Sequence, residues 1–333
     1  MPGARSPMYD LRIGPPSRQL ALAERRHRTM NRATAAAAQA RDGSLWIDKR
    51  LPKLFMAPTV ILLLALAIGP LLFVFGVSLT NWELVSMGNP TFVWLSNYIQ
   101  VFRDARFWNA AKNTGIVLVA GVGLQLLFGL ITALLLNREF RLKKLVTSLF
   151  LIPITIAPVV VGFQWRVIYH ESFGPLNYLI RLLGLGQGRA WLADTSTALF
   201  SILIAEVWQW TPFVTIVLLA GLQSISPRVY EAANVDGASP WKVFWRVTLP
   251  LLKPTVIIVA LFRVMDVFKI FDLVFLLTGG GPGSASESLS LYTYITGFRY
   301  FSMGYATALA VIQLMIVTVI SKQLVKMMAS GRA

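Results

Sequence analysis

The chain has 333 residues, of which 56% are hydrophobic and only 14% are charged. A soluble protein of this size keeps about a quarter of its residues charged, so the composition indicates a membrane protein. The net charge of +16 favours a role in membrane topology over nucleic-acid binding, because no nucleic-acid motif accompanies it. The absence of cysteine excludes disulfides, thiolate metal sites and cysteine nucleophiles, and the two histidines, His27 and His170, do not favour a metal site.

Residues 1–53 form a strongly basic N-terminal segment with few acidic residues. A signal peptide would place a short apolar core and a small-residue cleavage site soon after such charges. The apolar run here begins only at Leu54 and is too long for that role. We therefore expect a disordered or loosely helical tail that its charge holds in the cytoplasm.

Six segments are long and apolar enough to cross a hydrocarbon core as tilted helices. The first carries no charge, and the third contains Pro153 and Pro158. The sequence predicts an all-α membrane protein with a six-helix domain over residues 54–326 and a short cytoplasmic tail over residues 327–333. The predicted spans are residues 54–79, 114–137, 145–167, 196–222, 254–278 and 303–325.

Basic residues are concentrated on the second-to-third connection, on the fourth-to-fifth connection and after the sixth span. The other connections have fewer cations per residue and carry tryptophans, which suit a membrane interface. Because cytoplasmic loops are enriched in Lys and Arg, this distribution predicts that both termini lie in the cytoplasm. The cations are Arg138, Arg141, Lys143, Lys144, Arg228, Lys242, Arg246, Lys253, Lys322, Lys326 and Arg332, and the tryptophans are Trp82, Trp94, Trp108 and Trp191.

The connection between the fourth and fifth spans, residues 223–253, has a pattern of its own. It predicts a short helix, a break at Gly237 and a second helix that begins near Ser239 and Pro240. Serine is a favoured helix cap and proline is favoured in the first turn, so this start is well defined. Small alanines in the first helix leave a surface that another protein can approach closely.

This connection resembles the signature loop of the permease components of binding-protein-dependent ABC importers. The signature is Glu-Ala-Ala, three residues, Gly, nine residues, an aliphatic residue, any residue and Leu-Pro. The chain has valine at the aliphatic position, where isoleucine is common in the family. The matching residues are Glu231, Ala232, Ala233, Gly237, Val247, Leu249 and Pro250.

In that family the loop forms a coupling helix that sits in a cleft of the cytoplasmic ATPase and transmits its closure. The resemblance implies that residues 230–238 are the docking segment and that Gly237 lets the chain turn sharply. A surface helix pair without any partner is the alternative interpretation. The coupling residues that the resemblance implies are Tyr230, Glu231, Ala232, Ala233, Asp236, Gly237, Ala238, Leu249 and Pro250.

The resemblance extends over roughly residues 50–325 and leaves out the basic tail. Residues 92–99, 262–272 and 277–282 are similar to the sugar and glycerol-phosphate branch of the family. The resemblance implies a MetI-like permease bundle in the bacterial cytoplasmic membrane that imports a carbohydrate or polyol. It also implies three kinds of partner besides the lipid bilayer: a second, homologous permease chain, a pair of ATPase subunits and an extracytoplasmic solute-binding protein. It implies no nucleic acid.

The predicted fifth span contains Arg263, Asp266, Lys269 and Asp272, which alternate in sign at three-residue spacing. Neighbours three apart on a helix are close enough to pair. A charge at mid-bilayer costs about 2.5 to 3.5 kcal/mol on insertion scales, so these side chains must face a partner helix or a hydrated cavity. Two hypotheses remain open: the charges line the translocation path and bind solute hydroxyls, or they form ion pairs that hold the partner permease.

Three further residues belong to the candidate path. Phe268 and Phe271 offer flat apolar faces to a sugar ring. Glu206 lies about ten residues into the fourth span, near the midplane. It can pair with Arg263 of the next span, which we favour, or contact the solute.

The chain contains no Gly-x-x-x-x-Gly-Lys-Ser/Thr loop, so it does not cradle nucleotide phosphates by that device. The glycine-rich residues 279–283 lack the lysine and are better interpreted as a turn. We therefore expect no cofactor and no catalytic residue on this chain, with ATP hydrolysis on a separate subunit. An ion-coupled secondary carrier that uses the buried carboxylates is the alternative, although we find no internal repeat.

Overall fold

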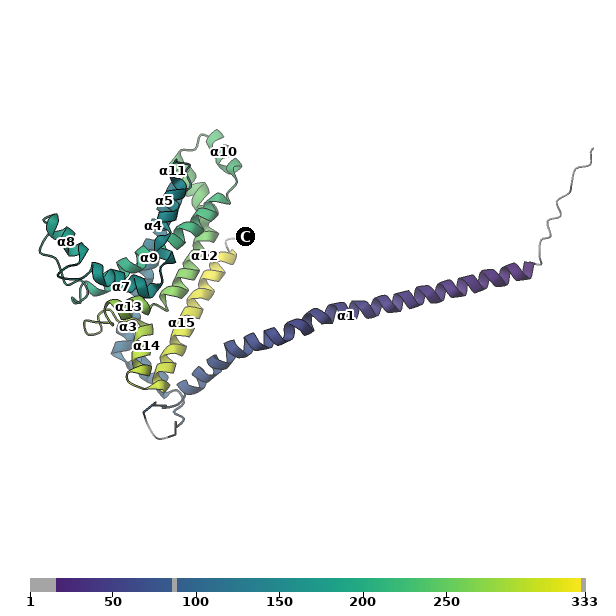
Figure 1. Ribbon diagram of the computed structural model, residues 1–333, viewed down its shortest axis with the longest axis horizontal. Coiled ribbons are helices and arrows are strands. Elements are labelled where there is room, and N and C mark those ends of the chain that lie inside the picture. Colours follow the sequence, from purple (N-terminus) through teal and green to yellow (C-terminus); the bar gives the residue numbers. More distant parts are fainter. Residues whose placement is uncertain (1–15, 86–88, 331–333) are drawn as a thin grey trace, which may run out of the picture. The chain divides into compact units, whose positions relative to one another are not determined.

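The computed structural model describes residues 16–85 and 89–330. Over these residues the chain is helical, with two isolated β-bridges (Figure 1). It divides into two compact units, Met1–Leu71 and Leu72–Ala333.

Helix α1, Pro16–Ser78, runs without a break from the basic segment into the first apolar segment. Its part Phe55–Ser78 is long and apolar enough to cross a membrane, in agreement with the first predicted span. The sequence left residues 1–53 as disordered or loosely helical. The structure has a helix from residue 16 onward, and residues 1–15 lie outside the described residues.

Five helices among the described residues are long and apolar enough to span a membrane, and four of them belong to the second unit. In two of the four, a five-residue π-helical segment, η1 or η2, interrupts the α-helical pattern. The span Ala105–Leu136 consists of α3 (Ala105–Ile116), η1 (Val117–Gly121) and α4 (Val122–Leu136). The span Pro240–Val267 consists of α11 (Pro240–Val243), η2 (Phe244–Thr248) and α12 (Leu249–Val267). The other two are α9 (Ala198–Gln223) and α15 (Met303–Ser330).

The third predicted span, residues 145–167, is not one helix. The structure divides it into α5 (Lys143–Phe150), α6 (Ile152–Thr155) and α7 (Pro158–Ile168). Proline lacks an N–H and disfavours the helical region in the residue before it. Ala157, directly before a proline, accordingly has an extended ψ of 139°. The third predicted span is therefore not confirmed as a single helix: the sequence placed Pro153 and Pro158 inside it, and the structure has breaks beside these prolines.

The fifth predicted span, residues 254–278, also has different limits. The helix begins much earlier, at Pro240, and α12 ends at Val267. After a break at residues 268–271 the chain resumes as α13, Asp272–Leu277. The alternating charges therefore do not lie on a single helix. Arg263 and Asp266 lie on α12, Lys269 lies in the break, and Asp272 begins α13.

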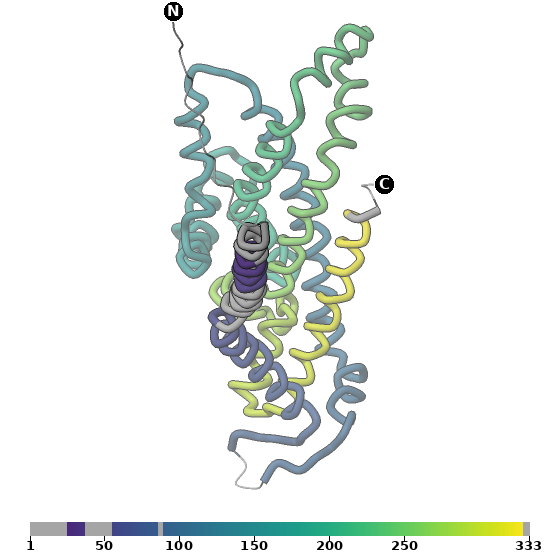
Figure 2. The backbone as a smooth tube through the Cα atoms, turned by 90° about the vertical axis from the view of Figure 1, so that its right-hand side faces the viewer, coloured from purple at the N-terminus to yellow at the C-terminus, as the bar shows by residue number. Residues whose placement is uncertain are grey.

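Helix α9 is the most buried of the five candidate spans. It packs on α4, α12, α7 and α13, and it contributes to two of the three clusters of buried apolar side chains. Helix α15 runs beside α12 and α14 (Leu289–Phe298), as the yellow and green tubes of Figure 2 show. The remaining short helices are α2 (Ser96–Arg103), α8 (Pro175–Leu182) and α10 (Pro227–Val235).

Close approach of α4 and α9 depends on a glycine. A Cβ atom at Gly129 would lie 2.6 Å from Cγ1 of Val214 and 3.3 Å from the backbone nitrogen of Thr215. Small residues at such contacts let membrane helices pack backbone to backbone. Gly123 on the same helix has open space at that position.

We predict that Gly129→Ala destabilises the protein by about 1–3 kcal/mol, the usual cost of an overpacked contact. The measurement is the thermal midpoint of the purified protein in detergent. Gly123→Ala is the matched control and should keep or slightly raise the midpoint, because alanine favours a helix by roughly 1 kcal/mol over glycine. Equal midpoints for the two variants would contradict the close contact.

Candidate functional site

A small polar cavity of about 130 Å³ lies where the break between α12 and α13 meets α9 and the start of α7. Its walls carry charged, amide and aromatic side chains together, unlike the apolar groove that α4, α5, α6 and α9 line elsewhere in the bundle. The lining residues are Pro158, Glu206, Gln209, Trp210, Asp266, Lys269, Ile270, Phe271, Asp272 and Leu273.

Arg263 contacts the cavity-lining residues Glu206, Asp266 and Trp210 and is fully buried. Its Nη2 forms an ion pair with Glu206 of α9, which confirms the pairing predicted from the sequence. Its Nη1 lies 3.1 Å from Oδ2 of Asp266, so the predicted pairing of neighbours three apart is also present. A guanidinium does not lose its proton in a protein, so it must be given acceptors wherever it is buried.

Two further contacts complete the surroundings of this guanidinium. Nε of Arg263 donates to Oε1 of Gln125 on α4, at 2.9 Å. The Nε2 of Gln125 in turn donates to the backbone carbonyl of Glu206, at 3.2 Å. The ring of Trp210 lies 4.4 Å from the guanidinium carbon, a cation–π contact. Arg263 thus joins α4, α9 and α12 through one charged group.

The members of the predicted path differ in where they lie. Glu206, Asp266, Lys269, Phe271 and Asp272 all line the cavity. Arg263 is held behind them by its partners. The structure does not bring Phe268 to the cavity, because this side chain packs in the separate apolar cluster of Val264, Leu289 and Tyr292.

The lining side chains offer several kinds of contact. The side chain of Asp266 is 46% exposed although it also pairs with Arg263. Lys269 and Asp272 are exposed, one in the break and the other at the first position of α13. The ring of Phe271 stacks on Phe275 at 5.3 Å between centroids. The cavity can therefore offer acceptors, a donor and a flat ring face to one small polar molecule.

Gln209 also lines the cavity, although it was not among the predicted path residues. It is buried, and its Nε2 lies 3.4 Å from the carbonyl oxygen of Ile156. Its Oε1 has no hydrogen-bond partner among the residues that the structure describes. A buried acceptor without a partner is uncommon and suits a ligand donor. Gln209 and Trp210 share the polar stretch of the fourth span with Glu206, so the sequence did contain a signal for them.

The predicted coupling loop has the local structure that its sequence indicates. Helix α10 ends at Val235, and Gly237 adopts the left-handed conformation with φ of 68°. The N–H of Gly237 donates to the carbonyl of Asn234 and that of Ala238 to the carbonyl of Ala233, both at 3.0 Å. These two bonds form a Schellman motif, in which glycine is favoured at the left-handed position.

The second helix begins as predicted. Ser239 caps it, and its side chain accepts a hydrogen bond from the N–H of Lys242. Pro240 occupies the first turn. The predicted order of helix, glycine break and serine-capped helix is therefore confirmed.

Helix α10 lies at the tip of the bundle, beyond α11 (Figure 1). None of its residues is buried, and Val235 is 88% exposed. The nine residues that the resemblance places in the coupling loop lie in two groups. Tyr230, Glu231, Ala232, Ala233, Asp236, Gly237 and Ala238 belong to α10 and the turn after it, and Leu249 and Pro250 begin α12.

One helix joins the coupling loop to the cavity. The stretch Pro240–Val267 is continuous over 28 residues. It starts directly after the glycine turn and ends directly before the break that lines the cavity. Asp266 therefore lies near the far end of the helix that begins after α10.

The chain matches the family model described as "Binding-protein-dependent transport system inner membrane component" over residues 125–328. It is 44% identical to the "Probable ABC transporter permease protein y4oQ" of Sinorhizobium fredii, a match that covers 81% of this chain and 87% of the relative. It is 35% identical to the "Trehalose/maltose transport system permease protein MalF" of Thermococcus litoralis, over 82% of this chain and 91% of the relative.

The fold is similar to that of a solved bacterial ABC transporter involved in the import of the acidic polysaccharide alginate. The TM-score is 0.73, the sequence identity is 24%, and the match covers 86% of this chain and 98% of the other. The comparisons lend no support to the ion-coupled carrier that the sequence left as an alternative.

We predict that Arg263→Met destabilises the protein by about 3–5 kcal/mol, because it leaves Glu206 buried without its cation. The expected result is a loss of monodisperse protein in detergent. Adding Glu206→Gln to Arg263→Met should recover much of the stability. Lys269→Met, which removes an exposed cation, is the control and should leave stability nearly unchanged. An Arg263→Met variant as stable as the parent would contradict the inferred pairing.

Proposed function

The chain belongs to the family of binding-protein-dependent transport system inner membrane components and is a permease subunit of an ABC importer, and we propose that it imports a carbohydrate or polyol. Its similarity to a trehalose/maltose permease supports this solute class. The cavity chemistry supports it as well, since hydroxyl groups suit Asp266, Asp272 and the unpaired oxygen of Gln209.

We place the cavity residues on the translocation path and the buried ion pair behind them. Asp266, Lys269, Asp272 and Phe271 would contact the solute, because they line the cavity and lie outside the apolar core. Arg263 and Glu206 would hold the helices that carry these residues. The rest of the path would come from a second permease, a different chain that is homologous to this one.

We assign the coupling loop to the cytoplasm together with both termini, on the strength of the basic residues at these positions. A pair of ATPase subunits would receive α10, whose residues are all at least partly exposed. An extracytoplasmic solute-binding protein would deliver solute at the opposite end. In this proposal the chain itself binds no nucleotide and no metal.

The mechanism follows from the continuous stretch Pro240–Val267. Closure of the ATPase subunits pushes α10, and the rigid helix carries that displacement to the break at residues 268–271. The cavity then changes from facing the cytoplasm to facing the outside, in alternation with the partner permease. The observation that supports the coupling step most is the signature spacing around an exposed, glycine-terminated helix.

We predict that Gly237→Val abolishes co-purification of the ATPase subunits with the permease. The left-handed backbone at this position costs a β-branched residue roughly 1–3 kcal/mol, so the turn after α10 would change its direction. A Cβ here meets no atom within 4 Å, so the effect would be conformational and not steric.

Gly237→Asn is the matched control, because asparagine tolerates the left-handed region. It should retain the ATPase and ATP-dependent uptake. Both variants are first checked for monodispersity, which separates a docking defect from misfolding. Undiminished ATPase binding and uptake by a monodisperse Gly237→Val protein would refute the docking assignment.

A further inference from the structure

The break between α12 and α13 exposes backbone carbonyls that a continuous helix would satisfy internally. Two serine hydroxyls from the start of α14 bind these carbonyls. Oγ of Ser290 donates to the carbonyl of Phe268 at 2.9 Å, and Oγ of Ser288 donates to the carbonyl of Ile270 at 2.8 Å. The backbone between them carries Lys269, and Asp272 follows it.

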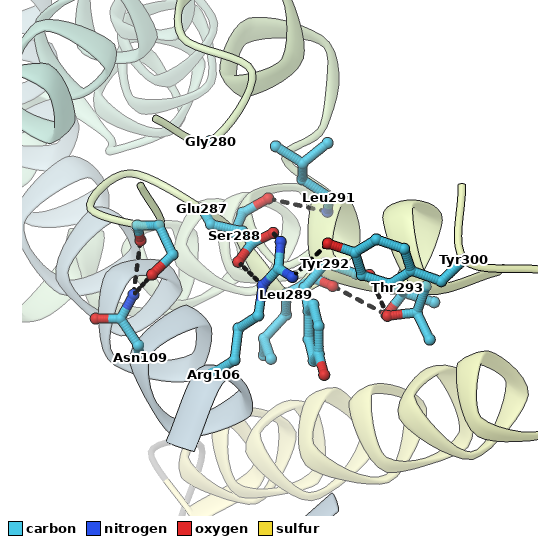
Figure 3. Close-up of polar contacts among 12 residues, drawn as sticks. Arg106, Asn109, Gly280, Glu287, Ser288, Leu289, Leu291, Tyr292, Thr293 and Tyr300 are labelled. Carbon is cyan, nitrogen blue, oxygen red and sulfur yellow. Dashed lines mark hydrogen bonds and ion pairs between the residues drawn. The ribbon is translucent and has the colours of Figure 1, made fainter. Parts of the chain in front are cut away.

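Ser288 has a second role in the same place. Its Oγ also accepts from the N–H of Leu291 and caps α14 (Figure 3). Nearby, Oγ of Ser286 donates to the carbonyl of Gly281 at 2.6 Å, in the glycine-rich turn that follows α13. We call residues 286–290 the clasp, since its hydroxyls hold the chain before and after α13.

The clasp is itself anchored to α3. Glu287 is 1% exposed and forms a bidentate ion pair with Arg106, with both N–O distances 2.7 Å. The hydroxyl of Tyr300 accepts from the same guanidinium at 2.9 Å, and Figure 3 shows Arg106 between Glu287 and Tyr300. Bidentate charged pairs of this kind fix geometry as well as supplying energy.

The backbone of the clasp is held from two sides. Nδ2 of Asn113 donates to the carbonyl of Glu287 at 3.1 Å, and Oγ1 of Thr114 accepts from the N–H of Leu289 at 3.0 Å. From α15, Nε2 of Gln313 donates to the carbonyl of Leu289 at 2.9 Å. The clasp therefore has a fixed position relative to both α3 and α15.

Asp104 fixes the beginning of α3, where Arg106 lies. Its carboxylate accepts from the N–H of Arg106 and from the hydroxyls of Tyr292 and Tyr305. Burial alone would raise the pKa of Asp104, but these hydrogen bonds outweigh it and lower the pKa below its ordinary value. The acid stays ionised at neutral pH and keeps Arg106 beside the clasp.

We propose that the clasp sets the geometry of the break, with Ser288 and Ser290 as positioning residues for Lys269 and Asp272 and with the Arg106–Glu287 pair as their anchor. The importance of this role rests on the proposed function, in which the break lines the solute path. Helix α3, which carries Arg106, and helix α14 lie toward the end of the bundle opposite α10 (Figure 1), which is the outer end in that proposal. Within the clasp, Glu287 binds Arg106 of α3, and the nearby Ser288 and Ser290 bind the break that lines the cavity.

The test uses the absence of cysteine from the chain. Ile270→Cys places one thiol on this chain at a side chain that is 8% exposed and whose carbonyl Ser288 binds. In the assembled complex, a bulky maleimide that the cavity of about 130 Å³ does not admit modifies this thiol only when the break opens, so its rate follows the opening equilibrium. The readout is the mass of the permease chain over time.

We expect Ser288→Ala with Ser290→Ala to accelerate modification at position 270 by about fivefold or more, since two buried carbonyls lose their donors. Glu287→Gln should also accelerate it, by a smaller factor. Thr307→Val is the matched control, because the Thr307 hydroxyl donates to Met303 and Gly304 of its own helix. It should leave the rate unchanged.

A second thiol distinguishes a local effect from a general one. Val214→Cys on α9 lies at a side chain that is fully buried and far along the chain from the clasp. The serine variants should leave its slow modification unchanged. An unchanged modification rate at position 270 in the serine variants would contradict the proposal that the clasp sets the geometry of the break. An equal acceleration at position 214 would contradict it as well.

The same preparations separate this proposal from the proposed function. If the unsubstituted complex, supplied with its ATPase and binding protein, fails to import any carbohydrate tested, the proposed solute class is wrong. The modification rates at positions 270 and 214 would still test whether the clasp sets the geometry of the break, because they do not depend on uptake.

Discussion

The rest of the structure depends on how a permanent positive charge is accommodated among apolar helices. Arg263 is fully buried and cannot escape the cost of burial by losing its proton. It is therefore surrounded by Gln125 from α4, Glu206 from α9, Asp266 from its own helix and the face of Trp210. These partners fix three helices relative to one another. Asp266 is the most exposed of the acceptors, and it both pairs with Arg263 and lines the cavity.

From that fixed point the two functional regions follow. Toward one end, the helix that carries Arg263 continues back to Pro240 and the exposed α10. Toward the other, it ends at Val267 and gives way to the break that displays Lys269. In the proposed function, the ATPase docking segment lies directly before the start of this helix and the polar cavity lies at its end. This arrangement suits a transport subunit, because the proposed contact with the separate ATPase and the proposed solute site lie at different ends of that helix.

Most of the features that the sequence predicted have local causes. The glycine turn and serine cap depend on bonds between residues a few positions apart, so Gly237 and Ser239 were placed correctly. The Glu206–Arg263 pair was predictable because neither charge is tolerable alone in a membrane. The breaks near Ala157 and at residues 268–271 were missed, since apolar runs resemble unbroken spans. The second break is bound by Ser288 and Ser290, which lie about 20 residues further along, so no local pattern announces it. Phe268 was wrongly placed on the path for the same reason, because it lies in this break and its side chain packs in an apolar cluster away from the cavity.

The most direct test of the central claim asks whether the ATPase controls access to the cavity. Asp272→Cys supplies a thiol on a chain that has no other, and the complete complex is placed in proteoliposomes with its extracytoplasmic face outward. A membrane-impermeant maleimide is then added outside, with the ATPase subunits either empty or closed on a non-hydrolysable ATP analogue. The account predicts that position 272 reacts quickly in the closed state and is protected in the empty state. Equal reactivity in the two states would contradict it.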